Sequence, residues 1–389
     1  MIQYRLVQKT KVIEGPGCIE LLPQLCRENG FEKPFLVFDQ GIARAGIAGK
    51  ITGILEKAGI AYASYDRITP DPTSDLVEEG AALCREAGCD SLIAIGGGST
   101  MDAAKGINIM RVNQGRILDF VGHEDRMLPA GSLICIPTTA GTGSELSNWI
   151  VITDLTKGDK HPIDVRNSMS EYALLDPGLT TGLPSHITAE TGLDVFSHAF
   201  EAYTSSKCSP LTDLLCEKVM EEVIRWLPLA VTDGNNLEAR ERMMVCASYG
   251  GFLLIDCLVH IGHCIAHEIG ARFHIPHGAA CAYAFPEMVR HTAYARTEKI
   301  RYTGRLLGAR FSGNETPGEV AEKTIAAYRA FRDISVGLSP ISSYEPDLGK
   351  VNLEMAEHIF KDPITALTPT KTTVEDIFIM LYHIFTEGH

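Results

Sequence analysis

The chain has 389 residues, 45% hydrophobic and 22% charged, so it is long enough for two domains with cores of their own and too apolar to be disordered. Acidic residues outnumber basic ones by 49 to 35, and the formal net charge of -14 disfavours binding to nucleic acid or an anionic membrane. Neither number points to a particular substrate.

The cysteines and the N-terminus indicate a compartment. Eleven cysteines occur without a CxxC pair, several of them inside apolar runs, where a free cysteine behaves as a small buried hydrophobe. The first residues, MIQYRLVQKTKVIEG, lack the pattern of a signal peptide, and the most apolar stretch, 243–255, is shorter than the ~18–20 residues of a membrane span. We therefore expect a reduced, cytoplasmic protein.

The first half of the chain alternates between short apolar runs and segments with helical spacing. Residues 35–38, 91–95 and 133–136 are predicted strands, and 43–59 and 74–88 are predicted helices that end in glycine. This alternation predicts an α/β domain with a parallel, Rossmann-like sheet covered on both faces, which binds ligands at the carboxyl ends of its strands.

The second half reads as helices only. The strand pattern fades after residue 184, and helical spacing predicts the segments 188–205, 211–226, 237–270, 318–333, 353–361 and 373 to about 387. We expect an all-helical C-terminal domain.

A glycine-rich turn follows the predicted strand 91–95. Gly96, Gly97, Gly98 and Ser99 open a helix, where bare backbone N–H groups and the positive end of the helix dipole can bind a phosphate. The motif is not GxGxxG, and a plain tight turn is the alternative.

Two other strand ends carry polar groups. Asp39 ends the strand 35–38, where a carboxylate can accept hydrogen bonds from a ribose; the alternative is an ordinary turn residue. Residues 137–145, PTTAGTGSE, follow the strand 133–136 and offer hydroxyls and bare amides; the alternative is a polar loop. Two such loops at two strand ends together favour a dinucleotide site.

Histidines and one aspartate suggest a metal in the second half. Asp194 and His198 are four residues apart, on one face of a helix that is apolar almost all round, and a buried charge needs a partner. His263 and His267 repeat this spacing, and His277 follows in a Pro-His-Gly turn that could aim it at the same face. One buried histidine is usually a core residue, but five in the segment 260–277 favour a metal, with Fe(II), Zn(II), Co(II) and Ni(II) all open.

These motifs, taken in order, resemble the iron-containing (group III) alcohol dehydrogenase family. The matching segments are GGGSTMDAAK, PTTAGTGSE, DPGLTTGLPSHITAETGLDVFSHAFEAYTS and HCIAHEIGARFHIPHG, and the match extends from the GPG turn at 15–17 to TVEDI at 373–377. The resemblance implies an NAD-binding domain over 1–184, a helical metal-binding domain over 185–389, and a catalytic metal in the cleft between them.

The resemblance also assigns roles. The family's metal ligands fall on Asp194, His198, His263 and His277, and its histidine near the nicotinamide falls on His267. The pyrophosphate turn falls on Gly96, Gly97, Gly98 and Ser99, and further cofactor positions on Asp102, Thr138, Thr139, Thr142 and Lys160. Asp39 matches the position that favours NAD over NADP. His260 and His274 match no family role and are interpreted as structural or supporting.

Some residues depart from the family. Its usual PNP turn reads Pro70-Asp71-Pro72, which leaves the choice of cofactor open, and Trp149 follows the threonine-rich loop. The C-terminal NPR becomes Thr368-Pro369-Thr370, and Arg272 keeps anionic aldehydes in consideration. No metal ligand is affected, so the substrate is what these departures leave undefined.

The expected function is NAD(H)-linked oxidation of a small alcohol or reduction of an aldehyde, with the substrate oxygen held on Fe(II), Zn(II) or another divalent metal. His267 is expected to relay a proton to solvent. The alternatives are polyol oxidation like that of glycerol dehydrogenase, a lyase like dehydroquinate synthase, and a non-catalytic metal or nucleotide sensor. The resemblance further suggests a homo-oligomer, a dimer or larger.

Overall fold

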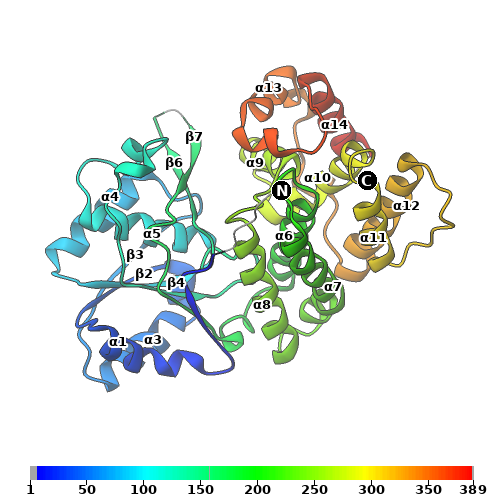
Figure 1. The fold of residues 1–389 in the computed structure, drawn as a ribbon. Coiled ribbons are helices and arrows are strands. Elements are labelled where there is room, and N and C mark those ends of the chain that lie inside the picture. The colour runs from blue at the N-terminus through cyan, green and yellow to red at the C-terminus, as the bar shows by residue number, and fades with distance from the viewer. Residues whose placement is uncertain (1–6, 157, 388–389) are drawn as a thin grey trace. The chain divides into compact units, whose positions relative to one another are not determined.

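The computed structural model of the protein describes residues 7–156 and 158–387. The chain divides into two compact units, an α/β unit over Val7–Gly182 and a helical unit from Leu183 onward (Figure 1). Each unit is described by itself.

The α/β unit is built on a six-stranded sheet in the order β1-β8-β5-β4-β2-β3, in which all neighbouring strands are parallel. The three predicted strands are confirmed as β2, β4 and β5, which lie side by side in the middle of the sheet. The strands are β1 (Lys11–Glu14), β2 (Pro34–Asp39), β3 (Ala63–Ile68), β4 (Ser91–Gly96), β5 (Leu133–Pro137) and β8 (Tyr172–Leu175).

Helices cover both faces of this sheet, as expected of a Rossmann-like domain. Along β2, Phe35 and Val37 pack into one hydrophobic core, while Leu36 and Phe38 pack into the core on the opposite face. Helices α1 (Leu22–Asn29) and α3 (Ile47–Lys57) lie on one side, and α4 (Ser74–Glu86) and α5 (Gly98–Val112) on the other (Figure 1). The short helices are η1 (Cys18–Leu21), η2 (Ile117–Phe120), η3 (Glu124–Arg126) and η4 (Pro177–Leu179).

Two features of this unit differ from the sequence prediction. The single helix expected over 43–59 is wrong: Gly46, at a φ of 76°, separates α2 (Gln40–Arg44) from α3. A hairpin that was not predicted, of β6 (Trp149–Asp154) and β7 (Asp159–Asp164), follows the threonine-rich loop and pairs antiparallel. Its strands are partly exposed, so they lack the continuous apolar runs of β4 and β5.

The helical unit contains no strand among its described residues, so the all-helical prediction is confirmed there. Helix α6 is its central element and packs against α7, α8 and α10. The helices are α6 (Ser185–Thr204), α7 (Pro210–Thr232), α8 (Leu237–Leu253), α9 (Ile261–Phe273), α10 (His277–Thr292), α11 (Thr297–Leu306), α12 (Pro317–Arg329), α13 (Leu353–Lys361) and α14 (Val374–Glu387), with shorter turns η5 (Ala330–Val336), η6 (Ile341–Tyr344), η7 (Leu348–Lys350) and η8 (Pro363–Leu367).

The long helix predicted over 237–270 is wrong. Helix α8 ends at Leu253, and α9 begins only at Ile261. Leu258 in the intervening segment has a φ of 55°, a left-handed conformation that ends helical winding. His277, expected in a turn, is instead the first residue of α10, after Pro276.

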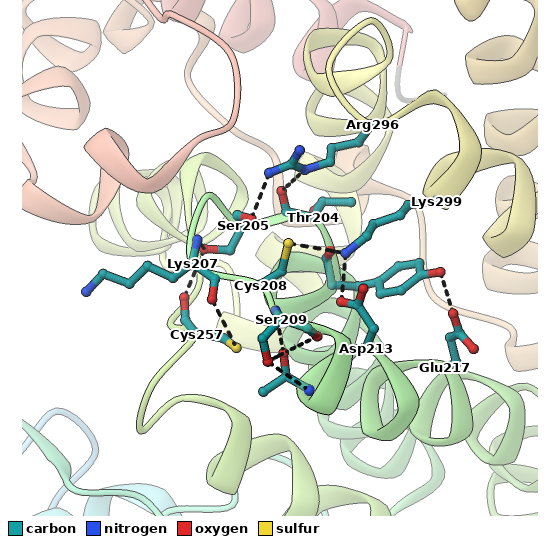
Figure 2. A network of polar contacts seen from close by, with 12 residues as sticks. Thr204, Ser205, Lys207, Cys208, Ser209, Asp213, Glu217, Cys257, Arg296 and Lys299 are labelled. Carbon is teal, nitrogen blue, oxygen red and sulfur yellow. Dashed lines mark hydrogen bonds and ion pairs between the residues drawn. The ribbon is translucent and has the colours of Figure 1, made fainter. Parts of the chain in front are cut away.

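The C-terminal end of α6 is fixed by a polar network that reaches α11 (Figure 2). The Arg296 guanidinium donates hydrogen bonds to the carbonyl oxygens of Thr204, at 3.0 Å, and Ser205, at 3.2 Å. Lys299 Nζ donates to the carbonyl of Tyr203 at 2.6 Å and to Asp213 Oδ1 at 2.7 Å. These cations satisfy carbonyls that the end of a helix leaves without partners, and so define where α6 stops.

Within the part of the chain that the structure describes, no helix is both long and apolar enough to cross a lipid bilayer.

Candidate functional site

Three helices of the helical unit bring the predicted metal ligands together. Asp194 and His198 lie one turn apart on α6, and their spacing places them on one face. His263 lies in the first turn of α9, and His277 begins α10. The four side chains therefore converge from three helices, and the packing of these helices sets the distances between them.

One carboxylate oxygen lies at the centre of this group. Asp194 Oδ1 is 3.8 Å from His198 Nε2, 3.5 Å from His263 Nε2 and 3.6 Å from His277 Nε2. Asp194 Oδ1 and His263 Nε2 are both buried, and neither has a hydrogen-bond partner within the described residues. Groups of this kind are rarely left without a partner inside a folded protein.

The site fits a divalent cation. His263 Nδ1 lies 2.5 Å from a carboxylate oxygen of Glu201 and must donate to it, since an ionised carboxylate only accepts. In the neutral ring, Nε2 then directs a lone pair toward Asp194 Oδ1. Two facing acceptors repel unless a positive charge lies between them, either a proton or a metal ion. Burial by itself lowers the pKa of His263, but the neighbouring Cys281, Glu201 and Asp194 hold that pKa well above its usual value, so a bound metal ion takes the place of a proton on Nε2. Carboxylate oxygen and imidazole nitrogen are ligands that divalent transition metals accept.

Glu201 was not identified from the sequence. It is fully buried on α6, and its Oε2 accepts hydrogen bonds from the backbone N–H groups of His260, at 2.6 Å, and His263, at 3.3 Å. A carboxylate behind a metal-binding histidine fixes the ring's tautomer and orientation. The available signal was an acidic residue seven positions after Asp194 in a helix that is otherwise apolar.

Charges in this cluster are coupled. Burial by itself raises the pKa of the Asp194 carboxyl, but the surrounding histidines, His198 first, together hold that pKa well below its usual range. Burial lowers the pKa of His198 to about 4. The carboxylate is thus ionised at neutral pH, beside a His198 ring that is neutral, and both are in the protonation states that metal ligands need.

A glycine sets the approach of α10 to α6. A Cβ on Gly278 would lie 2.0 Å from the carbonyl oxygen of Glu190 and 3.2 Å from Asp194 Cβ. Only a residue without a side chain allows this contact. The backbone of Gly278 thereby holds the neighbouring His277 beside Asp194.

The other histidines of this segment lie in different surroundings. The half-buried His267 ring stacks on His277, with centroids 5.3 Å apart, and lies 6.1 Å from the ring of His263. His260 is fully buried, with Nε2 2.9 Å from Thr204 Oγ1. His274 is exposed at the end of α9. His267 is therefore beside the ligand group, and His260 lies behind it against Glu201.

In the α/β unit, the predicted cofactor residues gather at the carboxyl ends of adjacent strands. Asp39 ends β2, the glycine turn follows β4, and the threonine-rich loop follows β5. The two loops touch: the Thr138 N–H donates to the Gly96 carbonyl at 3.0 Å. A Cβ on Gly98 would lie 2.7 Å from Thr142 Cγ2, and one on Gly97 would lie 3.2 Å from Thr139 Oγ1.

This edge of the sheet also begins a long helix. Gly98 and Ser99 form the first turn of α5, whose N-terminal N–H groups have no partners within the helix. Asp39 Oδ1 accepts the N–H of Ile42 at 2.9 Å and so caps α2. The carboxylate of Asp39 therefore has a structural role as the cap of α2, and it also lies at the carboxyl end of β2, where a ligand can bind.

A buried lysine anchors the threonine-rich loop, and sequence reasoning gave it no role. Lys105 on α5 is fully buried, and its Nζ donates to the carbonyl oxygens of Ser144, at 2.5 Å, and Ser147, at 2.9 Å. Asp102 accepts from Ser144 Oγ at 2.7 Å and from the Val151 N–H at 3.0 Å. Burial lowers the pKa of Lys105 and raises that of Asp102. Both side chains join α5 to the loop.

Two residues singled out in the sequence contact each other. Lys160 Nζ, on β7, lies 2.7 Å from Asp71 Oδ1. Asp71 has a φ of 54°, a left-handed conformation that aspartate and asparagine tolerate better than most residues. Asp71, which replaces the asparagine of the family's PNP turn, therefore forms an ion pair with Lys160, a predicted cofactor residue. Arg272 is also paired, with Glu268 Oε1 at 2.5 Å.

The chain belongs to the iron-containing alcohol dehydrogenase family. The family's sequence profile "Iron-containing alcohol dehydrogenase" matches residues 9–177, and the profile "Fe-containing alcohol dehydrogenase family, C-terminal" matches residues 188–385. The resemblance drawn from the motifs is thus confirmed, and the protein is an oxidoreductase.

Individual relatives extend over nearly the whole chain. A 1,3-propanediol dehydrogenase of Klebsiella pneumoniae is 32% identical over 95% of this chain and 96% of its own length. An NAD-dependent methanol dehydrogenase of Bacillus methanolicus is 30% identical over 93% of this chain and 95% of its own. The crystal structure of a 1,3-propanediol oxidoreductase, 31% identical, covers 99% of this chain and 100% of its own, with a TM-score of 0.92.

Proposed function

We propose that the protein is a metal-dependent, NAD-linked alcohol dehydrogenase or aldehyde reductase that acts on a small alcohol or aldehyde. The observation that carries the proposal is the pair of buried, unpartnered atoms, Asp194 Oδ1 and His263 Nε2, amid converging histidines. The relatives named as propanediol and methanol dehydrogenases support the substrate class.

Four side chains hold the divalent ion in this proposal. They are Asp194, His198, His263 and His277, and the family name favours iron. When bound, the ion supplies a Lewis acid for the substrate oxygen, and NAD supplies the acceptor or donor of the hydride. Glu201 orients His263 through Nδ1, so that Nε2 stays available to the ion.

The strand-end residues of the α/β unit bind NAD. Gly96, Gly97, Gly98 and Ser99 present backbone N–H groups at the start of α5 to the pyrophosphate. Thr138, Thr139 and Thr142 line the neighbouring loop, and Asp39 at the end of β2 accepts hydrogen bonds from the ribose and disfavours a 2′-phosphate. Asp102 contributes to NAD binding by holding this loop through Ser144, and Lys160 contributes from β7 of the β6–β7 hairpin.

His267 moves the proton. Its half-buried ring stacks on His277 without belonging to the ligand group, so a ring nitrogen can exchange a proton with solvent. A His267→Asn variant should slow turnover while its metal content stays at the wild-type value. Loss of metal from this variant would contradict the relay role.

Location and assembly complete the proposal. All eleven cysteines are free and most are buried, which suits a reducing compartment such as the cytoplasm. The protein is further proposed to form a homo-oligomer, a dimer or larger. Light scattering on purified protein that reports a single chain's mass would contradict this assembly.

The decisive assay follows NADH oxidation by anaerobically purified, iron-loaded protein with a panel of small aldehydes that includes hydroxylated and anionic members. Turnover on any member, abolished by a chelator and restored by metal, supports the proposal, and the order of rates defines the substrate. Silence with NADH and NADPH, with metal demonstrably bound, overturns it in favour of a lyase or a sensor.

A further inference from the structure

Cys281 lies beside the proposed metal ligands. It follows His277 by one turn of α10 and is 1% exposed, with Sγ 3.7 Å from His277 Nε2. Asp194, His263, His277 and Cys281 each offer one ligand atom, and these atoms all lie within 4.8 Å of one another. His198, which sequence reasoning placed in the ligand set, is outside this closest group.

The separations in this group match those of a shared ion. An ion with bonds of about 2.0–2.1 Å to nitrogen or oxygen and about 2.3 Å to sulfur spaces tetrahedral ligand atoms by roughly 3.3 to 3.6 Å. The Asp194–His263 and Asp194–His277 separations are 3.5 and 3.6 Å, and the Cys281–His277 separation is 3.7 Å. The sulfur thus lies at about the distance from His277 Nε2 that two ligands of one ion have, and within 4.8 Å of the other two ligand atoms.

The sulfur also lies among atoms that need a cation. Asp194 Oδ1 and His263 Nε2, both more than nine-tenths buried, are unpartnered within the described chain and belong to the same group. A cysteine that only fills space would be expected among apolar neighbours, as Cys246 on α8 is by sequence. Cys281 instead faces two imidazoles and a carboxylate.

We propose that Cys281 is a further ligand of the metal ion, through Sγ, in addition to the four side chains of the proposed function, Asp194, His198, His263 and His277. The inference rests on the metal centre of the proposed function and adds a soft donor to it. A metal-bound cysteine is a thiolate, so binding releases its proton to solvent. Thiolate sulfur favours Zn(II) and Co(II) over Fe(II), and this chain therefore binds zinc more tightly than an all-N/O set would.

Cobalt provides the test. The full chain is stripped with a chelator, loaded anaerobically with Co(II), and its absorption is recorded together with the bound cobalt. A Co–thiolate bond gives a strong charge-transfer band in the near ultraviolet, separate from the weaker visible bands of any four- or five-coordinate Co(II). We expect this band in the wild-type protein and in the matched control Cys246→Ala, and its loss in Cys281→Ala.

The remaining outcomes are distinguishable. Bound cobalt without the ultraviolet band, or a band that persists in Cys281→Ala, overturns the cysteine ligand but leaves the metal centre standing. Failure of the wild-type protein to bind cobalt, zinc or iron at all overturns the metal centre and the proposed function with it.

A competition titration sharpens the result and does not depend on turnover. Cys281→Ser, close in size, should lower zinc affinity by at least about tenfold, because even the loss of a residue that only hydrogen-bonds to a metal ligand has an effect of that size. The affinity for iron(II) should change less. Equal losses for both metals would show that the sulfur supplies packing and not coordination. Thermal unfolding of the metal-free variants checks that both remain folded.

Discussion

The proposed cofactor site of the α/β unit and the proposed metal site of the helical unit are prepared in opposite ways. At the strand ends of the α/β unit, Asp102, Lys105 and Lys160 all have protein partners, so the loops are held by the chain itself. In the helical unit, Asp194 Oδ1 and His263 Nε2 converge within the described structure without one. The first region is shaped before its ligand arrives, and the second is completed by its ligand.

This difference predicts different responses to substitution. Removing an anchor from the α/β unit should damage folding and NAD binding together. Removing a proposed ligand from the helical unit should damage metal binding while the fold survives, because no hydrogen bond within the described residues depends on Asp194 Oδ1 or His263 Nε2.

The largest effect is expected at a proposed metal ligand. His263→Ala removes the imidazole that faces Asp194 Oδ1 at 3.5 Å and should reduce bound metal below stoichiometry and kcat by roughly a thousandfold or more. Metal analysis and steady-state kinetics check it. The control is His186→Ala, an exposed histidine at the start of the same α6. Full activity in His263→Ala would contradict the proposal that His263 holds the metal ion.

Lys105→Met should have the next largest effect. It leaves the buried carbonyls of Ser144 and Ser147 without a donor and Asp102 without its cation, which should destabilise the α/β unit by about 3–5 kcal/mol. Denaturant unfolding and the KM for NAD measure it, with metal content unchanged. Lys50→Met, on the exposed surface of α3, is the control. An unaltered KM for NAD would show that the loop needs no anchor.

Glu201→Gln should have an intermediate effect. The amide cannot accept from His263 Nδ1 and from two backbone N–H groups at once without turning an NH2 group toward a donor, so the ring loses its orientation. Metal affinity should fall about 10–100-fold. Glu217→Gln is the control, because Glu217 likewise accepts a hydrogen bond from an aromatic side chain, here from the Tyr203 hydroxyl (Figure 2). It should leave metal affinity unchanged.

The smallest effect is expected for Asp71→Asn. Asparagine accepts the same left-handed conformation, and the ion pair with Lys160 is partly exposed, where such pairs contribute little. The KM for NAD should change by less than about threefold, measured at low and high salt. A larger change would mean that Asp71 contributes to cofactor binding directly.

Sequence patterns predicted the elements whose signal is local. Strands β2, β4 and β5 are continuous apolar runs in the middle of the sheet. Strands β1, β3 and β8 were missed: β1 and β3 carry exposed residues such as Lys11 and Arg67, whereas β8 is a buried apolar run of four residues. The break between α8 and α9 has only a weak local signal, because residues 254–260 contain neither glycine nor proline and a single charged residue, Asp256. Tertiary packing imposes the turn at Leu258.

The same limit applies to the site. Asp194 and His198 could be paired from their spacing because one helix carries both. Glu201 and Cys281 were not identified, because their meeting with His263 depends on how α6, α9 and α10 pack. Lys105 was given no role, because its partners lie about forty residues away in a loop.

The contact at Gly278 sets a lower limit to the distance between two helices of the helical unit. Since a Cβ there would lie 2.0 Å from the carbonyl of Glu190, backbone touches backbone where α10 meets α6, and α10 cannot carry His277 any closer to Asp194. Even a single methyl group at position 278 would therefore move a whole helix, and with it one side of the metal centre.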